Sequence, residues 1–170
     1  PSEVQNAMGP SIQDPRSGET ISAHVIFWND IVRTVEEWYF AQTAAADKSV
    51  QKLPMSDEMI GRMVQYVACH EVGHTLGLEH NFKASVAFSI KDLRNPTFAD
   101  QFGPTSSIMS YGRNNYVAQP GDGVKNFMPR LGPYDFFAIE YGYKQLGLPT
   151  PEAEKPALDG LLSKQVNDRT

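Results

Sequence analysis

Cysteine is nearly absent from this sequence, since Cys69 is the only one among 170 residues. A single cysteine excludes an intramolecular disulfide and any zinc site built from several thiolates. Long apolar runs are also missing, because no segment approaches the roughly 20 consecutive apolar residues of a membrane-spanning helix. Positive charge is not in excess either: the formal net charge is −5, which gives no basic field to attract nucleic acid. We expect neither a membrane span in this segment nor a nucleic-acid partner.

The remaining composition is that of a folded protein. Hydrophobic residues make up 41% and charged residues 21% of the chain, close to the averages of globular domains. A chain of 170 residues is long enough for one domain with its own core. The sequence begins at Pro1 without an initiator methionine or a signal-like apolar segment, and we therefore expect it to be part of a longer parent chain.

The first residues predict a β-hairpin. Turn-forming residues at 14–18 should reverse the chain after a short strand at Ser11–Gln13. Apolar and polar residues then alternate along Thr20–Trp28, which is typical of a second strand.

Two helices should follow the hairpin. Asn29 or Asp30 can cap the first with a side-chain oxygen, and apolar residues recur at helical spacing up to about Ala46. Ser56 can cap the second, which should run to about Leu76.

The second half of the chain has less regular patterning. Periodicity fades over 81–106, and the Gly-, Asn- and Pro-rich segment 112–132 predicts a long ordered loop. Pro133 suits the first turn of a last helix, which should span Tyr134–Tyr141 and end at Gly142.

A histidine-rich segment carries the clearest chemical signal. Residues 70–80 read HEVGHTLGLEH. On a helix, residues four apart lie about 40° apart around the axis and about 6 Å apart along it, so His70 and His74 can bind one zinc ion. Glu71 is rotated by about 100° from His70, where its carboxylate can hold a zinc-bound water without occupying the metal.

His80 can reach the same metal only if the helix ends before it. A continued helix would carry His80 about 15 Å along the axis from His70. Gly77 can end the helix, because glycine accepts the left-handed conformation that commonly follows a helix. Three histidines leave the fourth zinc position open for water, and Glu71 can accept a proton from that water during attack on a carbonyl.

The alternative interpretation of these residues is two solvated histidines and one in the core. An isolated HExxH occurs by chance in ordinary helices, whereas the longer pattern HExxHxxGxxH is much more specific. His24, in the second predicted strand, is interpreted as structural rather than as part of a second metal site.

The histidine motif resembles that of the metzincin clan of zinc metalloproteases, in which a downstream turn bears a methionine beneath the metal. Residues 107–111 read SIMSY, and Met109 matches the methionine of that Met-turn. The resemblance implies that Met109 forms an apolar floor under the histidines. Tyr111 matches a tyrosine that in astacins and serralysins can coordinate zinc and then support the oxyanion. Ordinary packing is the alternative for both residues.

Three further segments resemble large zinc-dependent metalloproteases of bacteria, a type common in Bacteroidetes. They read GPSI at 9–12, DPRSGE at 14–19 and GPYD at 132–135. The resemblance extends over about residues 1–143, and it implies strands and a helix ahead of Pro1. It also implies an extracytoplasmic location, which we take as an expectation.

We therefore predict an α+β, zincin-like fold in which a small, N-terminally truncated sheet packs on the active-site helix, followed by a loop-rich C-terminal part. Residues 1–147 should form the catalytic domain and 148–170 a weakly packed tail or linker. The strand Thr20–Trp28 is predicted to border the cleft.

The predicted function is that of a zinc endopeptidase, which binds one catalytic Zn²⁺ and hydrolyses internal bonds of a protein or peptide substrate. The alternative is a zinc-bearing but inactive pseudo-protease that acts as a binding module in a larger surface protein. Glu71 favours the enzyme, because a structural zinc site has no need of that carboxylate.

Overall fold

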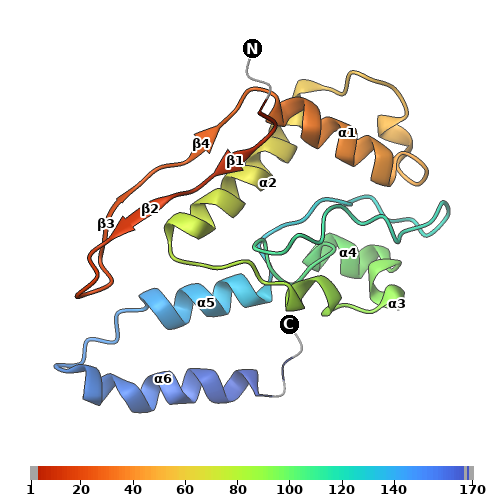
Figure 1. Cartoon of the computed structure of the whole chain (residues 1–170). Coiled ribbons are helices and arrows are strands. Elements are labelled where there is room, and N and C mark those ends of the chain that lie inside the picture. Colours follow the sequence, from red (N-terminus) through yellow and green to blue (C-terminus); the bar gives the residue numbers. More distant parts are fainter. Residues whose placement is uncertain (1–3, 167, 169–170) are drawn as a thin grey trace.

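A long antiparallel hairpin forms the N-terminal part of the computed structural model, which describes residues 4–166 and 168 (Figure 1). Its four short strands are β1 (Ala7–Met8), β2 (Ser11–Gln13), β3 (Thr20–Ala23) and β4 (Ile26–Phe27). β1 pairs with β4, and β2 pairs with β3. The described strands thus form two small sheets in series along one hairpin.

The predicted pairing of Ser11–Gln13 with the following strand is confirmed, but the prediction of one continuous strand over Thr20–Trp28 is wrong. The strand is interrupted at His24 and Val25. Pro10 lies opposite this interruption and has no N–H to donate to the ladder; its carbonyl accepts a bond from the His24 N–H at 3.1 Å. The missing donor explains why regular pairing stops there.

Two long helices follow, α1 (Ile31–Thr43) and α2 (Asp57–Thr75), joined by a segment that contains the short 3-10 helix η1 (Lys48–Val50). The predicted cap of α2 is confirmed, since the Ser56 hydroxyl accepts a hydrogen bond from the Met59 N–H at 3.3 Å.

The side-chain cap predicted for α1 is wrong. Asp30 is the N-cap residue, but neither its side chain nor that of Asn29 makes a capping hydrogen bond. A capping side chain usually needs an extended backbone at its own residue, whereas Asp30 is already helical with φ −72° and ψ −6°. Backbone bonds begin the helix instead, from the Ile31 N–H to the Trp28 carbonyl.

The hydrophobic core lies mainly between α1 and the first half of α2. Val35 and Tyr39 enter it from α1, and Met63 and Val67 enter it from α2. Phe127 closes it from the long loop that follows α4. This packing fixes the position of α2, the helix that carries the first two histidines.

The chain beyond α2 contains short helices and one long loop. In order these are η2 (Lys83–Val86), α3 (Ile90–Leu93), α4 (Pro96–Phe102), the loop at 103–132 and α5 (Pro133–Tyr143). The long loop lies where the sequence predicts one. With the strands confined to the N-terminal hairpin and helices elsewhere, the described chain has the predicted α+β organisation.

The sequence did not predict α3 and α4, because neither is long enough for a helical period to show. Their capping residues hold them instead. Ser89 and Asp92 form a reciprocal capping box at α3, and the Asn95 side chain accepts from the Phe98 N–H at the start of α4.

The predicted end of α5 at Gly142 is wrong, since the helix continues to Tyr143 and Lys144 is its extended C-cap. The Tyr143 hydroxyl donates to the Leu76 carbonyl at 2.7 Å, which ties the last turn of α5 to the end of α2. A glycine within a helix costs only about 1 kcal/mol relative to alanine, and this contact holds the turn that Gly142 would otherwise weaken.

The segment predicted as a tail, 148–170, contains the further helix α6 (Pro151–Gln165). The Thr150 hydroxyl caps it by accepting from the Ala153 N–H at 3.3 Å. α6 contacts α5 and has no buried residue of its own. The domain boundary after residue 147 stays a prediction. Among the described residues, no helix has the length and apolar character needed to cross a membrane.

Two glycines give opposite predictions for stability. A Cβ on Gly132 would lie 2.1 Å from the Ser106 carbonyl oxygen, so Gly132→Ala should lower the free energy of unfolding by about 1–3 kcal/mol, as overpacking does. Gly61, inside α2, has nothing within 4 Å of an added Cβ, so Gly61→Ala should raise it by about 0.5–1 kcal/mol. Urea unfolding followed by circular dichroism measures both, and equal effects would contradict the close contact at Gly132.

Candidate metal centre

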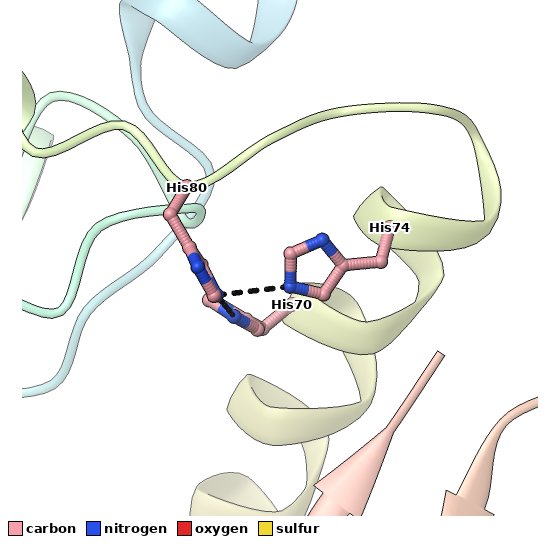
Figure 2. Close-up of side chains that lie close together, drawn as sticks. All are labelled: His70, His74 and His80. Carbon is pink, nitrogen blue, oxygen red and sulfur yellow. Dashed lines mark hydrogen bonds between the residues drawn. The ribbon is translucent and has the colours of Figure 1, made fainter. Parts of the chain in front are cut away.

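Three histidines converge at the end of α2. His70 and His74 project from consecutive turns of the helix, and His80 comes from the segment that folds back beside it (Figure 2). The Nε2 atom of His80 lies 3.2 Å from that of His70 and 3.0 Å from that of His74. One nitrogen from each ring lies within 4.8 Å of the others, so the three residues could hold one metal ion.

The return of the chain depends on the backbone after α2. Gly77 has φ 85°, in the left-handed region, where a side chain would be strained. The Gly77 N–H bonds to the His74 carbonyl at 2.9 Å, and the Leu78 N–H bonds to the Gly73 carbonyl at 3.0 Å. These bonds satisfy carbonyls at the end of the helix and turn the chain, which carries His80 back to its partners.

The other ring nitrogens are held by backbone carbonyls. The His70 Nδ1–H donates to the Ile108 carbonyl at 2.8 Å, and the His74 Nδ1–H donates to the Leu78 carbonyl at 2.9 Å. A carbonyl oxygen can only accept, so each Nδ1 carries the proton and each Nε2 presents a lone pair to the centre of the cluster. Metal-bound histidines are typically oriented by such outer contacts.

The spacing of the inward nitrogens is better explained by a cation bound between them than by hydrogen bonds among the three rings. Burial lowers the pKa of His70 and of His80 and therefore favours neutral rings. The His80 Nε2 can then donate to one neighbour at most, and its other short N···N contact has no proton between the two nitrogens. Ligands held at 2.0–2.1 Å in tetrahedral geometry lie about 3.3 Å apart, close to the two distances observed. The donor set therefore fits zinc.

Glu71 lies beside the cluster, buried beneath the hairpin. Burial raises the pKa of its carboxyl group. The hairpin comes so close that a Cβ on Gly9 would lie 2.1 Å from the Glu71 carbonyl oxygen. Only glycine allows this approach, which the sequence alone did not predict.

Met109 is fully buried under α2. A Cβ on Gly73 would lie 2.3 Å from its sulfur atom, so the thioether packs directly on the helix between the two histidines. The Met109 carbonyl accepts a hydrogen bond from the Asn81 N–H at 2.9 Å, next to His80. Met109 thus contacts both α2, which carries His70 and His74, and the segment that carries His80.

Tyr111 lies at the edge of the cluster. Its ring centroid is 4.1 Å from that of His80 and 5.8 Å from that of Phe82. The residue is 46% exposed, so its ring faces solvent as well as His80.

A cleft in two parts opens beside Glu71. The metal part, of about 380 Å³, is lined by the three histidines, Glu71, Tyr111 and the strand segment 6–10. The other part, of about 280 Å³, lies between α1 and α2 and reaches Arg113. The prediction that Thr20–Trp28 borders the cleft is wrong, because that strand lines neither part and lies on the far side of segment 6–10 from α2 (Figure 1).

Asp135, in the first turn of α5, is a residue whose role was not predicted from the sequence. Its carboxylate is buried and accepts hydrogen bonds from the Ser107 hydroxyl at 2.6 Å, the Ile108 N–H at 2.7 Å and the Gly132 N–H at 2.8 Å. The carbonyl of the same residue, Ile108, accepts the hydrogen bond from His70. In the sequence, an acidic residue in the first turn of a helix indicates only favourable capping, so Asp135 gave no sign of its contact with residues 107 and 108.

His24 takes no part in this centre. It is exposed on the hairpin, opposite Pro10. Within the described part of the chain, no other group of three His, Cys, Asp or Glu side chains is close enough to hold a metal.

Asp135→Asn should weaken the centre without removing a ligand. The amide replaces one carboxylate oxygen, an acceptor, with an NH₂ group, a donor. That donor would face either the Ser107 hydroxyl or the two backbone N–H groups, so the free energy of unfolding should fall by about 1–3 kcal/mol. Metal affinity should fall by roughly 10–100-fold, the usual effect of losing an outer contact. Chelator competition and thermal unfolding measure these changes. Glu140→Gln, exposed on the same helix, is the matched control, and unchanged metal affinity in Asp135→Asn would sink this interpretation.

Comparison with known proteins agrees with this centre. A protein-family model described as Met-zincin matches residues 52–170, which is more than half of the chain and includes α2, the three histidines and α5. No curated protein and no solved structure matches the chain. Because this family model covers more than half of the chain, and includes the histidine cluster, the chain belongs to the Met-zincin family.

Proposed function

We propose that this chain is the catalytic part of a zinc-dependent endopeptidase that hydrolyses internal peptide bonds. The observation that carries the proposal is the convergence of three inward Nε2 atoms beside the buried Glu71 carboxylate, at the wall of an open cleft. Three protein ligands leave one position for a reactant, which distinguishes catalytic from structural zinc sites. Membership in the Met-zincin family supports the same chemistry.

Zinc at such a centre supplies Lewis-acid activation of water and of a substrate carbonyl. The Glu71 carboxylate accepts the proton of the attacking water and delivers it to the leaving amine. Its burial favours this role, because a raised pKa makes the carboxylate a better proton acceptor. Gly9 packs closely on the Glu71 backbone, which holds this residue at the wall of the cleft.

Tyr111 is proposed to donate its hydroxyl hydrogen to the oxyanion that develops on the carbonyl. Its ring lies against His80 and it lines both parts of the cleft, so the hydroxyl can reach a reacting group without entering the core. Preorganised donors of this kind stabilise the transition state more than the ground state.

A peptide substrate is proposed to bind in extended form along segment 6–10. One edge of β1 pairs with β4, while segment 6–10 also lines the metal part of the cleft. Addition of a peptide strand to such an edge provides main-chain hydrogen bonds that do not depend on substrate sequence. We also propose that the protein lies outside the cytoplasm and is related to the Bacteroidetes enzymes. The catalytic unit is proposed to end near residue 147.

Two variants should separate metal binding from turnover. His80→Ala removes one of three ligands and should sharply lower zinc content, measured by elemental analysis. Glu71→Gln keeps the shape of the side chain but cannot take the proton, so zinc content should persist while turnover falls by about 10²–10⁴-fold. Glu79→Gln, exposed and outside the cleft, is the control. Full zinc binding without turnover in the wild-type protein would favour the pseudo-protease instead.

Tyr111→Phe tests the oxyanion role. The ring remains, so packing against His80 should be kept and zinc should stay bound. Loss of the hydroxyl should lower kcat by about 10²–10³-fold at the upper end, with KM little changed, because the interaction forms mainly in the transition state. Tyr116→Phe, an exposed tyrosine on the same loop, is the control. A kcat within about threefold of wild type would leave Tyr111 as a packing residue.

A further inference from the structure

Arg113 has a backbone conformation that arginine rarely adopts. Its φ is 58°, in the left-handed region that is disfavoured for residues with a Cβ. Its neighbours impose this conformation. A Cβ on Gly112 would lie 2.1 Å from the Thr105 methyl carbon, and the backbone and side-chain N–H groups of Asn114 both donate to the Gln42 side-chain oxygen, at 3.1 and 3.0 Å. Strained residues held in this way cluster at ligand-binding sites.

The Arg113 guanidinium has an aromatic neighbour but no anionic one. Its Cζ atom lies 3.6 Å from the ring centroid of Trp38 on α1, a cation–π contact. Arg113 forms no ion pair with the residues that the structure describes, and neither do Arg62 and Arg130, whereas the other three described arginines each pair with a carboxylate. The side chain is half-buried, so an unpaired positive charge is fixed in the wall of a cavity.

That cavity is the second part of the cleft. Its volume of about 280 Å³ is just below the roughly 300 Å³ at which small-molecule pockets begin, which suits one side chain. Ile31 and Val67 give it apolar walls, and His70 and Glu71 connect it to the metal part. A substrate side chain beside the reacting bond would enter this space.

We propose that the cavity binds an aspartate or glutamate side chain of the substrate, next to the bond that is cleaved. This inference rests on the proposed peptidase function and names its substrate class. The guanidinium presents donors whose spacing matches the two oxygens of a carboxylate, and apolar walls strengthen such a pair by excluding water. A lysine or arginine side chain would meet a like charge. An aromatic side chain would compete with Arg113 for the face of Trp38.

The test uses the zinc-loaded protein and quenched-fluorescence peptides, amidated at the C-terminus so that only side chains supply a carboxylate. The peptides differ at one position, occupied by Glu, Gln, Leu or Lys and scanned on both sides of the cleaved bond. We expect one position at which kcat/KM for Glu exceeds that for Gln by about tenfold or more, as a charge-assisted bidentate contact allows.

Arg113→Asn removes the charge with a residue that tolerates the left-handed backbone, and it should bring the Glu-to-Gln ratio close to one. Arg33→Gln is the matched control, because Arg33 is exposed on α1 and pairs with Glu37 outside the cleft; the ratio should persist. Cleavage with no preference for Glu at any position, or a preference that survives in Arg113→Asn, would overturn the carboxylate site while leaving the peptidase function intact.

Absence of cleavage for every peptide would instead contradict the proposed function. In that case, binding of the Glu and Gln peptides to the cavity tests the carboxylate site. Trp38 lies in the cavity wall, so its fluorescence, recorded in a Trp28→Phe background, reports occupancy. A change caused by the Glu peptide and not by the Gln peptide, and lost in Arg113→Asn, supports a carboxylate-binding site. An equal response to both peptides overturns it.

Discussion

The buried carboxylate of Asp135 is the interaction on which the centre depends. It joins α5 to the Ser107 hydroxyl and the Ile108 N–H, and the carbonyl of Ile108, in the next peptide unit, orients the ring of His70. A buried charge is costly unless hydrogen bonds replace its water, and three donors surround this one. Because both the N–H and the C=O of Ile108 are engaged, the backbone at this residue cannot rotate without breaking a bond at one end. The direction of the His70 lone pair is therefore set by a residue that never touches it.

Close backbone approach is the second constraint, and glycine makes it possible at three places. Gly9 lets the hairpin meet Glu71, Gly73 lets the Met109 sulfur pack against the histidine helix, and Gly132 lets the start of α5 meet Ser106. An added Cβ would come within 2.1–2.3 Å of an atom at each place. Larger residues would move the hairpin or the Met109 segment away from α2, or the start of α5 away from Ser106.

The sequence predicted the parts of the site that depend on local geometry. His70, His74 and Glu71 follow from the period of one helix, and Gly77 with His80 follows from the need to end it. The Ser56 cap was predictable for the same reason. Contacts between distant segments were not: Gly9 meets a residue 62 positions later, and Asp135 meets one 27 positions earlier. The interruption at His24 was also hidden, because its cause, Pro10, lies on the opposite strand.

The chemistry and the proposed selectivity come from different parts of this fold. The three histidines and Glu71 all lie within the single segment 70–80, which the α1–α2 core holds in place. Arg113 instead lies on the long loop, tied through Asn114 to Gln42 of α1. Changes at Arg113 can therefore alter which side chain fits the cavity without altering the histidine geometry.

The catalytic segment and the loop that carries Arg113 meet at Tyr111, two residues before Arg113. Tyr111 lines both parts of the cleft. Its ring packs against His80, so the loop that carries Arg113 also contacts one of the proposed ligands. Because the contact is made by an aromatic ring and not by the Arg113 side chain, the loop can keep its place when Arg113 is replaced. A rigid catalytic segment beside a separately anchored loop is an arrangement in which substrate preference can change while the reacting groups stay in place.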